Sequence, residues 1–173
     1  MEKGFTLVEL LIVIGILAVL TAAVVVVLNP AQLLAQARDS QRFADLDAVQ
    51  TAIIFWLATA SSPTFGNSGT TYCTAMGTPD SGSCTGSNPT SSVNGNGWIR
   101  ANLTQATGGS PLAALPQDPS NGTTYFYVFE NDGTNFELNC NLESTKYSGK
   151  EQTDGGDSAT WYEVGTDPDL NLI

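Results

Sequence analysis

The sequence predicts an α+β fold in which a long N-terminal helix, half transmembrane and half amphipathic, packs on a small antiparallel β-sheet. Three observations predict this fold. Residues 5–28 are almost wholly apolar, residues 31–58 continue with helical spacing, and residues 123–143 alternate around an Asp-Gly turn. We therefore expect the helix to lie across the sheet.

The chain divides into four segments on composition. Residues 1–4 form a short polar leader, residues 5–28 a transmembrane helix, residues 29–60 its amphipathic continuation, and residues 61–173 a loop-rich β domain that faces water. This single small domain has room for one core.

The first long element is the apolar run at residues 5–28, whose only charged residue is Glu9. As a helix it spans roughly 36 Å, enough to cross the hydrocarbon core of a bilayer. Its alternative is a secretory signal cut after Ala23, but the apolar run continues past that position. Asn29 and Pro30 follow, and the proline predicts a kink or a locally unwound point.

The second helical element, residues 31–58, is amphipathic. Its apolar stripe consists of Leu46, Val49, Ile53, Trp56 and Leu57. Charged residues are expected away from this stripe: Arg38, Asp39, Arg42 and Asp45. The stripe needs a cover, which the sheet is expected to supply.

The next segment, residues 63–97, is small, polar and predicted to be a long surface loop. A bridge between Cys73 and Cys84 would staple this loop, which indicates an oxidising compartment. Cys140 alternates in phase with apolar neighbours, so we expect a buried free thiol there. Pairing of Cys140 with one of the other two cysteines is the alternative.

The β domain begins with weaker signals. Residues 98–103 predict a short strand, and residues 110–116 predict a single helical turn that docks its leucines. The clearest signal is a hairpin of residues 123–130 and 134–143 around Asp132-Gly133. A third strand is expected at residues 161–164, after an acidic, Gly-rich loop.

Composition excludes several functions. The net charge of −11 repels phosphate backbones, so no direct binding of nucleic acid is expected. The chain has no histidine, which removes His-activated nucleophiles and His-ligated metals. A hydrolase with paired carboxylates, such as Glu130 and Asp132, remains as an alternative, but a turn explains both residues. We predict that the protein is not an enzyme.

Glu9 is the residue that most strongly indicates function. A carboxylate at the centre of a membrane helix costs about 2.5–3.5 kcal/mol, so such residues usually have a partner and a role. If a peptidase cuts after Gly4, the new N-terminus is the α-amine of Phe5. The amine of a neighbouring, staggered subunit can then neutralise Glu9 and set the register of the helices. The alternative is that Glu9 snorkels to the headgroups.

The residues Gly4-Phe5-Thr6-Leu7-Val8-Glu9, followed by the apolar run, resemble the class III signal of type IV prepilins and type II secretion pseudopilins. This resemblance implies cleavage after Gly4 by a prepilin peptidase, N-methylation of Phe5 and a pilin-like fold. It further implies that Glu9 guides subunit addition and that Pro30 marks where the helix loosens in a filament.

The resemblance is strong over about the first 60 residues and holds in outline beyond them. Residues 115–119 resemble the motif before the sheet in pseudopilin-G-like proteins. One departure is that many pilins carry a C-terminal cysteine pair, whereas Cys73 and Cys84 lie in the middle loop. Adhesion roles of the C-terminal pair are therefore not carried over.

Calcium is the one cofactor that this resemblance suggests. Pseudopilin-G-like proteins often hold calcium near the C-terminus, and Glu151, Asp154 and Asp157 offer hard oxygen ligands in a Gly-rich stretch. A solvated acidic loop is the alternative. Two glycosylation sequons, at Asn102 and Asn121, fall on expected surface loops.

The leading hypothesis is a structural subunit of a type IV pilus or pilus-like filament, stored in the inner membrane with its N-terminus inside and then exported to the cell surface. Its expected partners are copies of itself, the prepilin peptidase and an inner-membrane assembly platform. The alternatives are a type II secretion pseudopilin and an anchored adhesin or binding module that never polymerises. The sequence leaves open the role of the filament and its helical symmetry. It also leaves open whether this subunit is a major pilin, a minor pilin or a pseudopilin.

Overall fold

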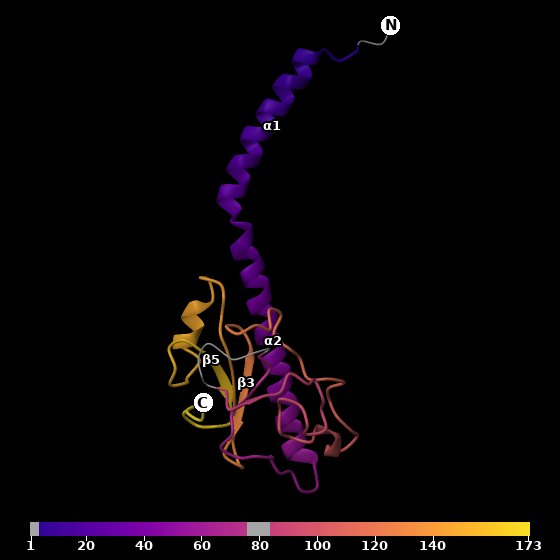
Figure 1. The fold of residues 1–173 in the computed structure, drawn as a ribbon, viewed down its shortest axis with the longest axis vertical. Coiled ribbons are helices and arrows are strands. Elements are labelled where there is room, and N and C mark those ends of the chain that lie inside the picture. Colours follow the sequence, from indigo (N-terminus) through magenta and orange to yellow (C-terminus); the bar gives the residue numbers. More distant parts are fainter. Residues whose placement is uncertain (1–3, 76–83) are drawn as a thin grey trace.

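The computed structural model describes residues 4–75 and 84–173. It shows a helical column that projects far from a globular head (Figure 1). The column is α1 (Leu7–Leu28) followed by α2 (Pro30–Thr59), and the head packs against one face of α2. The expected order of a long helical segment and then a small sheet is confirmed.

The break between the two helices lies at Asn29, the residue before Pro30. Asn29 has a left-handed backbone with φ of 40°, and it ends α1 while its side chain accepts a hydrogen bond from the N–H of Gln32 in α2. Pro30 occupies the first turn of α2, where its missing N–H leaves no helical bond unmade. The apolar and amphipathic helices are thus two elements, as the proline predicts.

The sheet has the strand order β2-β1-β3-β4-β5. Its strands are β1 (Tyr72–Cys73), β2 (Gly86–Ser87), β3 (Tyr127–Asn131), β4 (Phe136–Cys140) and β5 (Tyr162–Gly165). All neighbours pair antiparallel except β1 and β2, which are parallel. The predicted small antiparallel sheet is confirmed, with β3, β4 and β5 within the hairpin and third strand that the sequence predicts and β1 as a further strand.

The turn between β3 and β4 follows from its residues. Asp132 Oδ1 accepts hydrogen bonds from the N–H groups of Thr134 and Asn135 at 2.7 and 2.6 Å. Gly133 has a φ of 98°, which glycine adopts without strain. The predicted hairpin is therefore confirmed, with shorter strands than its alternating pattern.

The core lies between α2 and the inner face of the sheet. Leu46, Val49, Ile53 and Trp56 are fully buried there, as the apolar stripe predicts. The facing side chains of the sheet are Tyr127, Phe129, Phe136, Leu138 and Cys140. Full burial of each large apolar side chain stabilises the fold by roughly 1.5–3 kcal/mol.

The expectations for residues 63–116 were partly wrong. Strands β1 and β2 lie within the predicted surface loop. The predicted strand at 98–103 forms one bridge, between Asn94 and Asn102, followed by a short 3₁₀ helix, η1 (Leu103–Gln105). Residues 110–116 form no helical turn.

Residues 63–116 are held in place mainly by single apolar side chains that insert into the core, and little by regular secondary structure. Trp98 and Leu115 insert into the core, and the Trp98 Nε1–H donates to the carbonyl of Pro116 at 3.0 Å. The N–H of Leu115 donates to the carbonyl of Ser91, so loop backbone pairs with loop backbone. Isolated apolar residues in a loop show no periodicity in the sequence. The sequence pattern of residues 63–116 was therefore misleading about their structure.

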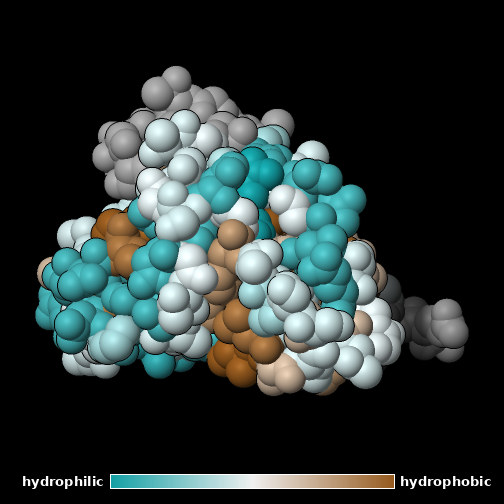
Figure 2. Space-filling model, turned by 90° about the horizontal axis from the view of Figure 1, so that it is seen from below, coloured by the Kyte–Doolittle hydropathy of each residue, from teal (hydrophilic) through white to brown (hydrophobic). Residues whose placement is uncertain are grey.

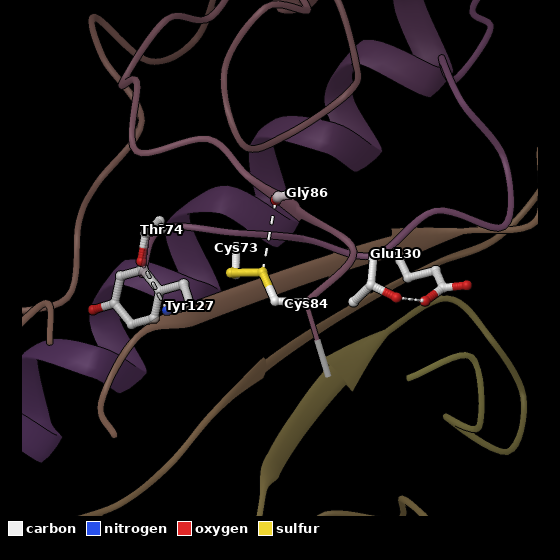
Figure 3. Close-up of a disulfide and its surroundings, with 7 residues drawn as sticks. Cys73, Thr74, Cys84, Gly86, Tyr127 and Glu130 are labelled. Atoms are coloured by element: carbon white, nitrogen blue, oxygen red, sulfur yellow. Dashed lines mark hydrogen bonds between the residues drawn. A yellow bond between two sulfur atoms is a disulfide. The ribbon is translucent and has the colours of Figure 1, made fainter. Parts of the chain in front are cut away.

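A disulfide joins Cys73 of β1 to Cys84, and it lies against the outer face of the sheet (Figure 3). With a sequence separation of 11, such a cross-link contributes roughly 2–3 kcal/mol by loop closure. Cys140 is unpaired and fully buried on the inner face. Burial raises the pKa of this thiol, which keeps it protonated and unreactive.

Candidate functional site

Helix α1 exposes apolar side chains around its whole circumference, among the residues whose side chains the structure describes. A soluble surface helix would show one apolar stripe, whereas α1 is apolar all round. Within the described residues, the stretch Leu7–Val25 is the one helical segment with the length and composition to cross a membrane. Such a helix needs either lipid or other helices around it.

Glu9 lies in the first turn of α1, where it forms a capping box with Thr6. Its Oε2 accepts hydrogen bonds from the backbone N–H and the hydroxyl of Thr6, both at 2.8 Å. The Thr6 hydroxyl oxygen in turn accepts from the Glu9 N–H at 3.2 Å. The helix N-terminus, whose dipole favours an anion, thus holds this carboxylate within a single copy of the chain.

The second carboxylate oxygen of Glu9, Oε1, receives no hydrogen bond from the residues that the structure describes. Phe5, one helical turn earlier, is 80% exposed. The geometry therefore leaves Glu9 able to accept from a cationic group of another molecule. The role of Thr6 was missed in the sequence, although the T-x-x-E spacing is the signature of a capping box.

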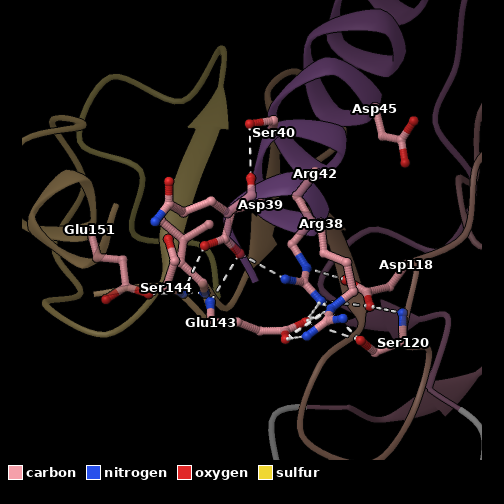
Figure 4. Close-up of polar contacts among 12 residues, drawn as sticks. Arg38, Asp39, Ser40, Arg42, Asp45, Asp118, Ser120, Glu143, Ser144 and Glu151 are labelled. Atoms are coloured by element: carbon pink, nitrogen blue, oxygen red, sulfur yellow. Dashed lines mark hydrogen bonds and ion pairs between the residues drawn. The ribbon is translucent and has the colours of Figure 1, made fainter. Parts of the chain in front are cut away.

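A second polar constellation anchors α2 in the head (Figure 4). Arg42 is fully buried, and its guanidinium contacts Asp39 at 2.8 Å, Asp118 at 2.6 Å and Glu143 at 2.5 Å. Arg38 pairs with the same carboxylate of Glu143. Arginine can bind several carboxylates at once because its planar guanidinium group offers five N–H donors.

Asp39 completes the constellation by binding backbone. Its two carboxylate oxygens accept from the N–H groups of Glu143 and Ser144 at 2.9 and 2.8 Å. The expectation that Asp39 and Arg42 lie away from the packed face of the helix was wrong, since both are 0% exposed. Their charge is tolerated inside because partners from distant loops neutralise it.

These contacts predict an acid-induced loss of stability. Burial alone would raise the pKa of Glu143, but hydrogen bonds from Arg38 and Arg42 outweigh it and lower this pKa to about 2. Because the folded pKa lies below the ordinary value, the stabilisation is complete above about pH 4.5 and is lost as the pH falls towards 2. Denaturant titrations from pH 2 to 5, followed by the fluorescence of the buried Trp56 and Trp98, should show this loss.

The matched control is Glu143→Gln, which keeps the size of the side chain and removes its titration. We expect its stability to depend less on pH across the same window. Equal slopes for the variant and the wild type would contradict the assignment.

The acidic residues named as calcium ligands are not brought together. No group of three or more carboxylate, cysteine or histidine side chains that could hold a metal occurs among residues 4–75 and 84–173. Glu151 accepts from the N–H of Leu142 at 3.0 Å, and Asp154 accepts from the N–H groups of Gly156 and Glu163. Glu151, in η2 (Ser148–Gln152), and Asp154 thus accept hydrogen bonds from the backbone, and calcium binding by Glu151, Asp154 and Asp157 stays a prediction.

The two sequon asparagines are both half-buried. The hydroxyl of Thr104 donates to Asn102 Oδ1 at 2.6 Å, and Asn121 adopts a left-handed backbone with φ of 38°. Their glycosylation stays a prediction.

The stalk is an apolar helix with one capped acid, it carries a small α+β head, and it has the length and composition of a membrane anchor. Residues 1–25 match the family described as the prokaryotic N-terminal methylation motif. This motif supports a type IV pilin-like or pseudopilin-like protein, structural rather than enzymatic, that is anchored in the membrane as a precursor. Neither the comparison with curated proteins nor that with solved structures gave a match.

Proposed function

We propose that this chain is a structural subunit of a type IV pilus or pilus-like extracellular filament, whose core is a bundle of α1 helices. The observation that carries the proposal is the exposed, all-round apolar surface of α1 together with the methylation motif at its start. In the membrane, lipid covers this surface. In a filament, the α1 helices of neighbouring copies cover it.

Glu9 is the residue that sets the order of this bundle. After cleavage at Gly4, the free amine of Phe5 on one copy pairs with Glu9 of its neighbour, whose Oε1 has no donor among the described residues. In an apolar bundle the main effect of this ion pair is to fix the axial register of neighbouring helices, because any other stagger buries an unpaired charge. Pro30 then marks the point at which the column unwinds during assembly.

The head presents a different surface from the helix. Seen from the end opposite the N-terminus, it is mostly hydrophilic, with hydrophobic residues in small patches (Figure 2). An apolar hollow of about 510 Å³ on α2, lined by residues that include Ala48, Phe55 and Leu112, adds a contact surface outside α1. The Ser-, Thr- and Asn-rich loops favour a surface pilus over a short periplasmic rod.

The proposed path has three steps. The precursor inserts with its N-terminus in the cytoplasm, a prepilin peptidase cuts after Gly4, and an assembly platform moves the subunit from the membrane into the filament. The disulfide between Cys73 and Cys84 fits a head that folds outside the cytoplasm.

The mature N-terminus tests this function. Protein is isolated from the native membrane and from the sheared surface fraction, and its terminal peptide is identified by mass spectrometry. We expect a chain that begins at N-methylated Phe5 in both fractions, with filaments visible in the sheared one. A retained Met1, or cleavage after Ala23, would contradict the proposed filament subunit and favour an anchored module that does not polymerise.

A further inference from the structure

The outer face of α2, opposite the sheet, carries an exposed stripe without charged residues. The helix buries its inner side chains, among them Leu46, Val49 and Ile53, in the head. On the other side, exposed residues recur every three or four positions, and we call them the outer seam. They are Leu34, Ala37, Gln41, Ala44, Ala48, Thr51 and Phe55. The water-facing side of a helix usually carries charged residues, so this uncharged seam indicates a contact surface.

The exposed large hydrophobic side chains of the head region are confined to this helix. Among the described residues that follow Leu28, every large hydrophobic side chain that is exposed belongs to α2. These side chains are Leu33, Leu34, Ile54 and Phe55. The apolar surface that lacks a cover is therefore one strip along α2, and it continues the apolar surface of α1.

The outer seam has the spacing of the contact positions in a coiled coil. These positions, called a and d, alternate at intervals of three and four residues along each helix. Leu34, Gln41, Ala48 and Phe55 take position a, and the seam residues between them take position d. Most buried residues of α2 take positions on the opposite side of the helix, so the head leaves the seam accessible.

A hollow of about 510 Å³ lies at the C-terminal end of the outer seam. Its walls include Ala48, Thr51, Ala52, Phe55, Pro111 and Leu112. The four α2 residues among them have the spacing of the hole that receives one side chain of a partner helix in a coiled coil. When two such helices lie parallel and level, the side chain that enters this hole is Thr51 of the second copy.

The membrane anchor fixes how two copies meet. Helix α1 has the length and composition to cross a membrane, and only Asn29 separates it from α2. Copies that are inserted the same way therefore present their outer seams parallel and at the same height. Confinement to one membrane also raises their effective concentration, so that a seam of small residues suffices for contact.

Charge favours contact along the outer seam. The chain has a net charge of −11, so two heads repel each other across most of their surface. The charged residues that flank the seam are Arg38, Asp45 and Asp47. In a parallel, level pair, Asp45 faces Ser40 of the second copy. Asp47 faces Ala52, so that no acidic residue that flanks the seam faces another.

We propose that the subunit is held in the membrane as a parallel dimer, in which the outer seams of two copies pack against each other. This proposal rests on the membrane anchor and not on filament formation. The alanines of the seam let the helix axes approach to about 8 Å, and Gln41 fixes the register at a cost in stability. A pair of this kind separates readily when one copy enters a filament.

The test is disulfide cross-linking of the full chain in phosphatidylcholine liposomes, which contain no assembly platform. An introduced cysteine is the reactive one, because Cys73 and Cys84 are bonded and Cys140 is buried. Ala37→Cys lies on the seam, and its matched control Gln36→Cys lies one residue earlier and outside it. We expect oxidation to give at least about tenfold more dimer for Ala37→Cys, because a disulfide requires Cα atoms within about 7 Å.

A charge placed on the seam should separate the two copies. Ala44→Glu brings two like charges face to face, and we expect it to abolish the cross-link of Ala37→Cys. The matched control Gln36→Glu adds the same charge outside the seam and should leave the cross-link unchanged. Ala44 is exposed in a single copy, so its substitution leaves the core of the head intact, which tryptophan fluorescence checks.

Two results would overturn the proposal. One is equal cross-linking of Ala37→Cys and Gln36→Cys. The other is a bridge from Ala48→Cys of one copy to Ala22→Cys of another, without any bridge at Ala37→Cys. That bridge would show that α1 of a staggered copy occupies the seam. Either result leaves the filament subunit standing, because the mature N-terminus and the sheared filaments test that function separately.

Discussion

Replacement of Arg42 by methionine is expected to lower the free energy of unfolding by about 3–5 kcal/mol. Methionine fills most of the volume, but Asp39, Asp118 and Glu143 then face one another without the guanidinium that contacts all three. Breaking a buried ion pair leaves uncompensated charge, which is far worse than replacing the whole pair by apolar groups. Denaturant titration of the full chain in detergent, followed by tryptophan fluorescence, measures the loss.

The matched control is Arg38→Met, because Arg38 contacts Glu143 alone and its side chain is 37% exposed. Glu143 keeps its ion pair with Arg42, and solvent already screens the partly exposed Arg38, so we expect a loss of about 1 kcal/mol or less. Similar losses for the two variants would show that Arg42 is not the centre of the network.

Replacement of Glu9 by leucine is expected to abolish filaments while leaving the amount of membrane-inserted protein unchanged. Leucine inserts into lipid more readily than a carboxylate, so the precursor remains anchored. The bundle, however, loses the acceptor for the neighbouring Phe5 amine, and that amine becomes a buried unpaired charge. Electron microscopy of the sheared fraction, with immunoblots of both fractions, measures the two quantities separately.

The control Thr6→Val separates pairing between copies from capping within one copy. It removes the hydroxyl that bonds Glu9 and weakens the helix start by about 1 kcal/mol, but it keeps the carboxylate. We expect filaments to form in this variant at reduced yield. A wild-type yield of filaments in Glu9→Leu would refute the pairing between copies. Loss of filaments in both Glu9→Leu and Thr6→Val would instead assign Glu9 to capping within one copy.

Several elements could be predicted because their causes are local. The apolar run of α1 has no other stable environment than lipid or other helices, and Pro30 ends it by lacking a donor. Asp132-Gly133 dictates a hairpin through its own hydrogen bonds and its positive φ. The stripe that ends at Trp56 follows from helical periodicity. In each case the physical cause lies within a few residues of the structure it produces.

Other features were decided only by tertiary structure. Asp39 and Arg42 read as an exposed helical pair, but their partners lie 76 or more residues away along the chain. Trp98 and Leu115 became core anchors within loops, and β1 was created by pairing with β3.

The same holds for the acidic face of the sheet. Glu137 and Glu163 alternate with apolar residues along two strands, a pattern typical of positions that face solvent. The C-terminal segment and the 154–160 loop cover them instead, so that both carboxyl groups are buried. Burial of a polar group depends on which distant segments cover it and which partners they bring, and no local pattern of the sequence contains that information. The sequence by itself determined the stalk, the methylation motif and the hairpin, whereas the ion network around Arg42 exists only because the fold brings distant residues together.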